Sequence, residues 1–414
     1  MKSTLLFCFC FVFISFGVLG KVGKNCPAGI PLCRCRRKGV VICKKTDCLQ
    51  RLPTGNITLE EGRQITSIVV SRQRSFEIIR SRDLTVLPNL KSARFFDNGI
   101  YAVLRGAFSY TPNIERLDLH KNRLSAIPHE IKSLRHLRQL NLGGNEISSI
   151  RFDAFSGNPR LQKLILKRNK LETFPGSLPP SLVKISIGGN LIPSFGDLRY
   201  LSNLKILRAE FNRLTTIGSS SLPPSLAELS ICSNALSSDG LDVSNLTRLK
   251  RLRLGGNVGI GPITRETFFK GANRLRELEI GHSNIDVIEP DSFACMRHLV
   301  VVDIGGNSLH TVDQELFAHN DNLRRVMVSG NPLQCDCLLV STLESLNQRL
   351  LGRFPREIDG SPRSSAVDLD HVVCADVDMR LTFPQNPPTT TAASLSRDAS
   401  SKSSCTTLLP VPDT

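Results

Sequence analysis

Residues 137–147 read LRQLNLGGNEI, and this stretch carries the pattern that decides the fold. Leu140 and Leu142 are separated by one polar residue, an alternation typical of a short strand whose leucines point inward. Asn145 follows three residues later. Its side-chain amide can satisfy backbone groups left open where the chain turns out of the strand. The stretch therefore predicts a short strand followed by a turn that the Asn holds.

The same template, apolar-x-x-apolar-x-apolar-x-x-Asn-x-apolar, is found in twelve copies, three of them degenerate. From Gln73 to Asn331 the copies follow one another about every 23 residues. Neighbouring copies are expected to pair as a parallel sheet, with the stacked Asn residues forming a polar ladder inside it. The copies are centred on Gln73, Asn98, Asn122, Asn145, Asn169, Asn190, Asn212, Asn234, Asn257, Ser283, Asn307 and Asn331.

A Phe recurs farther along several of these copies, and periodic apolar residues of this kind are typical of a buried core. We predict a buried spine on the side opposite the sheet. It comprises Phe108, Phe155, Phe268, Phe293 and Phe317.

The composition is 40% hydrophobic and 22% charged, which fits a folded chain and excludes a wholly disordered one. Lys and Arg outnumber Asp and Glu by 53 to 37, a formal net charge of +16. This balance favours acidic partners, but charge alone does not choose among nucleic acids, anionic glycans and acidic proteins.

Residues 1–20 have the order of a secretory signal peptide: Lys2, an apolar run from Leu5 to Leu19, and small residues at Val18 and Gly20. The apolar run is shorter than the roughly 20 residues that span a bilayer, and no later stretch is longer. We expect a secreted, extracellular chain without membrane insertion, for which a nucleic-acid partner is not expected.

Thirteen cysteines include Cys8 and Cys10 of this segment, which leaves 13 − 2 = 11. Most of the eleven gather near the two ends of the chain, and in an oxidising compartment such clusters indicate disulfide caps. Because the total is odd, at least one thiol is free or intermolecular. Disulfide-linked and non-covalent oligomers both stay open. Outside the pairs given below, the cysteines of unassigned fate are Cys48, Cys232, Cys295, Cys335 and Cys405.

Two cysteine motifs flank the repeats: Cys26-x6-Cys33-x-Cys35-x7-Cys43, and residues 331–337, which read NPLQCDC. With the repeats, they resemble the extracellular leucine-rich-repeat proteins with cysteine-rich caps over about residues 26–380. The phrase LPPSL at 178–182 and 222–226 is similar to the chondroadherin and small leucine-rich proteoglycan type. The alternative resemblance is to variable lymphocyte receptors or Toll-like ectodomains.

The resemblance implies an α/β leucine-rich-repeat solenoid, a curved horseshoe with a parallel sheet on its concave face and irregular loops and short helical turns on its convex face. It also implies disulfides Cys26–Cys35, Cys33–Cys43 and Cys337–Cys374. The third cysteine of the C-terminal cap is missing, and the chain has no Trp. Cys335 is therefore expected to be free, bonded to Cys405, or bridged to a second chain.

The domain boundaries follow from these signals. We expect a signal peptide at 1–20, an N-terminal cap at 21–62, twelve repeats at 63–333, a C-terminal cap at 334–381, and a disordered Ser/Thr/Pro-rich tail at 382–414. Asn56 and Asn245 open Asn-x-Thr sequons and are glycosylation candidates.

Two stretches resemble catalytic motifs, but both are incomplete. His129-Glu130 begins like a zinc-protease helix, but Ser133 stands where the second His belongs. The glycine-rich run at 255–261 has the wrong spacing for a phosphate loop. We therefore expect a non-enzyme with no metal and no cofactor.

The residues that flank the inward leucines carry the functional prediction, because they are expected to line the concave face. At the outward positions of the repeats centred on Asn169 to Asn257, only Glu210 and Glu228 oppose a basic set. Farther along the chain, Glu277, Glu279 and Asp303 make the face acidic. The basic set, which we predict to bind the ligand, is Lys163, Lys167, Arg168, Lys184, Lys205, Arg208, Lys250, Arg251 and Arg253.

We expect an acidic extracellular ligand, either a sulfated glycan or a matrix or cell-surface protein. A solvated face without a partner is the plain alternative. Two other functions stay open: soluble innate-immune recognition of microbial ligands, and a non-catalytic subunit of a secreted complex.

Phe96 and Phe211 are the clearest outward aromatic candidates. Pairs of glycines on the same face either leave lanes for a ligand or relieve crowding at the strand ends; they are Gly143-Gly144, Gly188-Gly189, Gly255-Gly256 and Gly305-Gly306.

Overall fold

The computed structural model describes residues 33–36, 39–44, 49–52, 54, 57–267, 272–334, 336–353 and 366–368, with the backbone alone of 379–381 and 408–410. The chain forms two compact units, Met1–Gly196 with Tyr200–Arg208 and Asp197–Arg199 with Ala209–Thr414. Several predictions concern residues outside this description. They are the signal peptide at 1–20, Cys26, Cys48, Asn56, Phe268, Cys335, Cys374, Cys405 and the side chain of Cys337.

The first unit is a solenoid whose sheet contains, in order, β1, β2, β3, β5, β7, β8, β9, β10 and β11. All pairs are parallel except β1 with β2, which is antiparallel. Its elements are β1 (Arg34–Arg36), β2 (Val40–Lys44), α1 (Leu59–Arg63), β3 (Ser67–Ser71), β4 (Ile78–Ile79), β5 (Ser92–Phe96), β6 (Ala102–Val103), β7 (Arg116–Asp118), the 3-10 turn η2 (His129–Ser133), β8 (Gln139–Asn141), β9 (Lys163–Ile165), β10 (Lys184–Ser186) and β11 (Ile206–Arg208).

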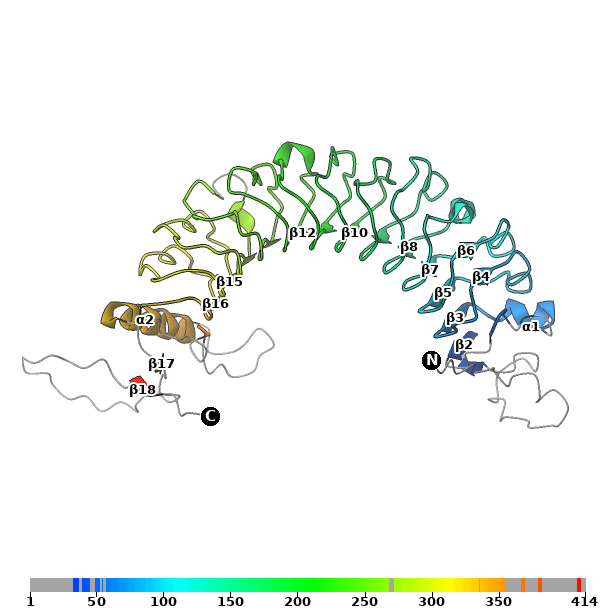
Figure 1. Ribbon diagram of the computed structural model, residues 1–414, viewed down its shortest axis with the longest axis horizontal. Helices are drawn as coiled ribbons and strands as arrows, with labels where there is room; N and C mark the ends of the chain where they lie inside the picture. The colour runs from blue at the N-terminus through cyan, green and yellow to red at the C-terminus, as the bar shows by residue number, and fades with distance from the viewer. Residues whose placement is uncertain are drawn as a thin grey trace, which may run out of the picture. The chain divides into compact units, whose positions relative to one another are not determined.

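The second unit repeats this architecture with the parallel strands β12 to β16. In both units the strands line one side and loops or short turns cover the other (Figure 1). Its elements are η3 (Ser219–Ser221), β12 (Glu228–Ser230), β13 (Arg251–Arg253), η4 (Ala272–Arg274), β14 (Glu277–Glu279), β15 (Val301–Asp303), β16 (Arg325–Met327), α2 (Cys337–Arg353), β17 (Met379–Leu381) and β18 (Leu408–Pro410). The predicted parallel-sheet solenoid is confirmed.

The predicted strand alternation also holds. In β9 the side chain of Leu164 is buried while its neighbours Lys163 and Ile165 are half-buried on the other face of the sheet. Leu164 pairs in register with Leu140 on one side and Ile185 on the other, so the apolar core is one column that passes from repeat to repeat. The described members of the Phe spine are buried as predicted. They are Phe108, Phe155, Phe293 and Phe317.

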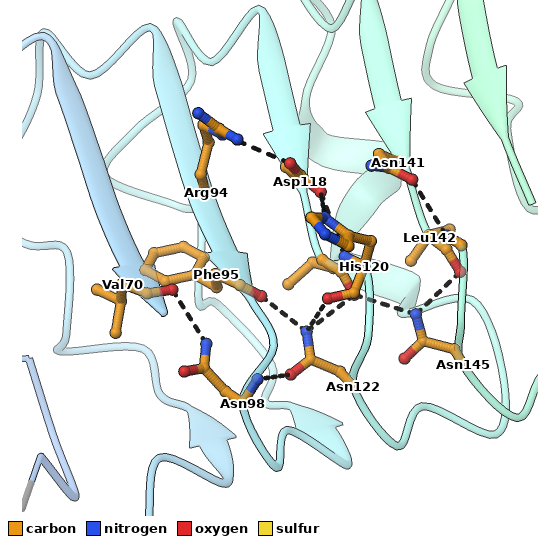
Figure 2. Close-up of polar contacts among 12 residues, drawn as sticks. Val70, Arg94, Phe95, Asn98, Asp118, His120, Asn122, Asn141, Leu142 and Asn145 are labelled. Carbon is orange, nitrogen blue, oxygen red and sulfur yellow. Dashed lines mark hydrogen bonds and ion pairs between the residues drawn. The ribbon is translucent and has the colours of Figure 1, made fainter. Parts of the chain in front are cut away.

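The Asn ladder is confirmed, and Asn145 shows how it works. Its Nδ2 donates to the carbonyl of Leu142 in its own repeat at 2.9 Å and to that of Leu119 in the preceding repeat at 3.0 Å. Its Oδ1 accepts the Leu124 N–H at 3.1 Å. Asn122 makes the same contacts one repeat earlier (Figure 2). Each Asn therefore links two turns of the solenoid.

The residue before each ladder position has a left-handed backbone. Glycines fill this position in the four Gly pairs, with φ of +66° at Gly144 and +77° at Gly256. The first glycine of a pair meets a different constraint, because a Cβ on Gly255 would lie 2.8 Å from the carbonyl oxygen of Gly281. Crowding at the strand ends therefore explains the glycine pairs. Gly330 holds the same left-handed position before Asn331. Non-glycine residues hold it in the other repeats: Arg72, Asp97, Lys121, Arg168, Phe211, Ser233 and His282.

Both ends of the repeat array carry additional structure. A Cys33–Cys43 disulfide, the pair that the resemblance implies, ties β1 to β2, and Cys35 is disulfide-bonded as well. At the other end, Arg349 of α2 donates to the Phe317 carbonyl at 3.1 Å, which places this helix against the last repeats.

One strand pair was not anticipated. β17 pairs with β18 in antiparallel fashion, and β18 lies in the tail expected to be disordered. Leu408 and Leu409 are the local apolar residues that suit a strand there.

Candidate functional site

The exposed side of β8 to β11, here called the first sheet face, holds most of the predicted basic set. Parallel pairing puts Lys163 of β9 directly beside Lys184 of β10. Adjacent strands lie about 4.8 Å apart, so the two lysines form a pair of like charges. Lys167 follows β9 on the same face, and Arg168 occupies the left-handed turn with φ of +55°; both are exposed.

Two members of the predicted set do not lie on a sheet face. Lys205 stands one residue before β11, where its N–H donates to the Val183 carbonyl at 2.9 Å. Lys250 has the same place before β13, with its N–H on the Ala227 carbonyl at 2.9 Å. The structure thus places both lysines one residue before the strands, whereas the outward strand positions belong to Ile206 and Arg251.

No carboxylate stands on the strand positions of the first sheet face. The outward residues of these four strands are Gln139, Asn141, Lys163, Ile165, Lys184, Ser186, Ile206 and Arg208. Basic, amide, hydroxyl and aliphatic side chains are thus the only kinds presented, and this part of the first unit is electropositive.

Sequence reasoning missed a hollow of about 590 Å³ that continues from this face over the earlier strands. Arg94, Arg116 and Lys163 contribute cations to its lining, and Asp118 contributes a carboxylate. Val40, Ile42 and Val69 supply apolar surface at the end nearest the N-terminal cap. Part of the signal was present in the sequence, because Val69, Arg94, Arg116 and Asp118 occupy outward positions of the repeats centred on Gln73, Asn98 and Asn122.

Arg94 and Asp118, which line this hollow, are in contact with each other, and Asp118 also contacts His120 (Figure 2). The Phe96 ring lies on the His120 ring with centroids 4.7 Å apart and planes within 7°, and the Arg94 guanidinium lies 5.0 Å from the Phe96 centroid. Asp118 contacts both of these side chains, at 3.4 Å from Arg94 Nε and 2.7 Å from His120 Nδ1. Phe96 is therefore half-covered, whereas Phe211, the other aromatic candidate, is 66% exposed.

The sheet face of the second unit corrects the predicted basic stripe. Arg251 Nε lies 2.8 Å from Glu277 Oε2, and Arg253 Nε lies 3.3 Å from Glu279 Oε2. A second contact joins Arg251 to Glu228 at 3.8 Å. The hydrogen bond with Glu277 raises the pKa of Arg251. These two arginines thus belong to a ladder of alternating charge, which leaves little positive field for a ligand.

Two titratable groups on that face have shifted pKa values. Burial raises the pKa of Asp303, and the charge of Asp368 acts in the same direction. Burial also raises the pKa of the Cys232 thiol to about 11. Neither has a metal-binding neighbourhood, since the described residues contain no group of three or more His, Cys, Asp or Glu able to hold an ion. Asn245, the sequon residue within the described range, is exposed.

The comparisons with known proteins agree with this architecture. Residues 88–147, 135–192 and 273–333 match the leucine rich repeat family. The repeats, the parallel sheet and the Asn ladder together are those of a leucine-rich-repeat solenoid. None of the helices in the described part of the chain is long and apolar enough to cross a membrane.

Two curated relatives share part of the chain. Leucine-rich repeat-containing protein 3B of Danio rerio is 31% identical over 111 residues, which cover 25% of this chain and 42% of the relative. Receptor-like protein Cf-9 of Solanum pimpinellifolium is 31% identical over 93 residues, which cover 22% of this chain and 10% of the relative. The matched part thus spans less than half the length of either.

Solved structures resemble the chain in fold. A chain of the octameric complex of Latrophilin 3, Unc5D and FLRT2 has a TM-score of 0.54 at 22% identity, covering 85% of this chain and 94% of its own. The Toll–Spatzle complex of Drosophila gives 0.59 at 19%, covering 74% and 46%. InlJ of Listeria monocytogenes gives 0.53 at 17%, covering 78% and 66%.

Proposed function

We propose that the chain is a secreted, non-enzymatic binding glycoprotein of the extracellular matrix or cell surface, and that the first sheet face recognises an acidic ligand. One observation carries the proposal: Lys163 and Lys184 stand side by side on strands that present no carboxylate. Two cations on adjacent strands can both contact one bound anion, which would lower their mutual repulsion.

Three features support this function. The Cys33–Cys43 disulfide suits an oxidising, extracellular compartment. The hollow beside the basic residues offers both cationic and apolar lining, as a binding surface needs. Two of the structurally similar proteins were solved in complexes with protein partners, Spatzle in one and Unc5D and Latrophilin 3 in the other.

Heparin-affinity chromatography tests the proposal with a sulfated glycan as probe. The double variant Lys163→Glu, Lys184→Glu should elute at lower salt than the parent chain, because it lacks two cations that attract the sulfate groups. Salt weakens this attraction, since charges are screened over about 8 Å at physiological ionic strength. The control, Arg105→Glu with Arg123→Glu, reverses two exposed arginines of the same unit that lie outside the sheet strands. Equal losses from both variants would show that net charge drives retention and would refute a site on the first sheet face.

The same variants test an acidic protein ligand. A partner protein captured from the extracellular space should be lost with the lysine variant and retained with the arginine control. The pair of variants therefore locates the site for either class of ligand, and the captured molecule identifies the class.

A further inference from the structure

The hollow of the first unit changes from apolar to charged along its length. Ile42 of β2 pairs in register with Val69 of β3. Val69 pairs with Arg94 of β5, and Arg94 pairs with Asp118 of β7. Adjacent strands lie about 4.8 Å apart, so this row of outward residues passes from aliphatic to ionic side chains within about 14 Å.

A second row of outward residues runs beside the first and has the same order. It begins at Val40 of β2 and reaches Arg116 of β7, with Ser67 and Ser92 between them. Arg36 of β1 pairs with Val40 on the other side. The apolar end of the hollow therefore lies between cations on both sides.

The apolar end keeps surface that a ligand can cover. Val40 and Ile42 are half-buried and line the hollow, whereas Val69 is 8% exposed and is already covered. Removing apolar surface from water is favourable in proportion to its area. An apolar side chain of a ligand would therefore gain free energy by packing on the two β2 residues.

The described lining residues of the hollow include four cations and one carboxylate, namely Arg36, Arg94, Arg116, Lys163 and Asp118. The carboxylate contacts Arg94 on the neighbouring strand (Figure 2). Arg116 is exposed, and its neighbours in register, Ser92 and Gln139, carry no charge. The lining is thus complementary to an acidic ligand, and Arg116 is placed to meet its carboxylate.

We propose that this hollow binds an extended, acidic segment of a partner protein, with an apolar side chain on Val40 and Ile42 and a carboxylate at Arg116. The inference rests on the proposed function and assigns its acidic ligand to the protein class. A sulfated polysaccharide supplies anions for Arg116 but no aliphatic or aromatic side chain for β2. An extended chain advances about 3.3 Å per residue, so the two groups of the ligand stand about four residues apart.

A displayed library of random linear peptides, selected on the full chain, tests the proposal. Enriched peptides should combine Asp or Glu with an aliphatic or aromatic residue about four positions away. The consensus peptide is then synthesised and titrated against variants. Val40→Thr with Ile42→Thr should raise its Kd about tenfold, because the pair loses apolar contact but keeps β-branched side chains that suit the strand. Arg116→Gln should also raise the Kd, by a factor that shrinks in high salt.

Matched controls lie in the same unit. Ile78→Thr with Val103→Thr changes two half-buried residues of β4 and β6 that do not line the hollow. Arg123→Gln changes an exposed arginine that is likewise outside its lining. Neither control should change the Kd. Thermal melts check each variant, and Ile42→Val, with an expected rise in Kd of about fourfold, replaces the threonine pair if that pair impairs folding.

Enrichment of no acidic peptide, or equal effects of the threonine pair and its control, would overturn the proposal. Dependence on Arg116 without dependence on Val40 and Ile42 would assign the hollow to a sulfated glycan instead. Concentration-dependent dimers that the threonine pair dissociates would place a second copy of the chain there. The heparin test of Lys163 and Lys184 changes neither β2 residue, so a failure of the proposed function is distinguishable from a failure of this inference.

Discussion

Arg251 of β13 donates from Nε to Oε2 of Glu277 on the neighbouring strand β14, with 2.8 Å between the two atoms. The equivalent outward position of β9 and β10 pairs Lys163 with Lys184. The same outward strand position thus carries opposite charges on adjacent strands in one unit and like charges in the other. In the second unit residues of opposite charge lie in contact, whereas in the first unit two residues of like charge stand on adjacent strands.

A double-mutant cycle measures the Arg251–Glu277 pair. Replacing each residue by Ala, alone and together, should give a coupling free energy of about 0.5–1 kcal/mol, because both side chains are partly exposed at 51% and 33%. Urea unfolding in low salt provides the values, and 1 M salt should bring the coupling close to zero. A coupling indistinguishable from zero at low salt would mean that the ladder makes no net contribution.

The Asn ladder should be sensitive to single substitutions. Asn145→Ala removes two donated hydrogen bonds and one accepted bond from a buried site, so we expect a loss of roughly 2–4 kcal/mol in the free energy of unfolding. Asn113→Ala serves as control, since exposed Asn113 makes one 3.4 Å contact to the Pro88 carbonyl. Similar losses for both variants would contradict the role of the ladder.

Gly255 should resist substitution for a reason of space. A Cβ there would lie 2.8 Å from the Gly281 carbonyl oxygen, so Gly255→Ala forces two strand ends apart and should lower the melting temperature. Gly176→Ala meets nothing within 4 Å and should leave it nearly unchanged. If Gly255→Ala were as stable as the parent chain, crowding would not explain the glycine pair.

Asp303 should make stability depend on pH with a defined sign. Burial holds its pKa above the ordinary value of 3.8, so the folded state binds this proton more tightly than the unfolded chain does. Its favourable contribution is complete below the unfolded pKa and is lost as pH rises through the folded pKa. Asp303→Asn keeps an oxygen that can accept the Gly305 N–H, now 2.9 Å from Oδ1.

The comparison of wild type with this variant across pH provides the check. The free energy of unfolding of wild type minus that of Asp303→Asn should decrease as pH rises above 3.8 and then level off. A difference that increases with pH would mean that the carboxylate is stabilised in the folded state.

The two described free cysteines, Cys232 and Cys295, should react at different rates. Because burial raises the pKa of Cys232 to about 11, little thiolate exists at pH 8 and alkylation by iodoacetamide should be slow. Cys295 is exposed and should be modified first. Peptide mapping after timed quenching measures both rates, and faster labelling of Cys232 would show that the second sheet face opens in solution.

The sequence alone determined the features that depend on local periodicity. Alternation around Leu140 and Leu142 identified the strands, and the Asn three residues later identified the ladder, because each of these patterns is contained within one repeat. Burial of Phe108 and Phe293 followed from the same period. Local pattern is enough to decide which side chains point inward when every repeat has the same shape.

The tertiary structure decided which charges meet. Loops of different length join the repeats, so the partner of each side chain depends on register between strands that are about 23 residues apart. Register placed Arg251 beside Glu277 and Lys163 beside Lys184. Electrostatic free energy depends on distances between side chains from different repeats, and the periodic pattern of one repeat does not contain those distances.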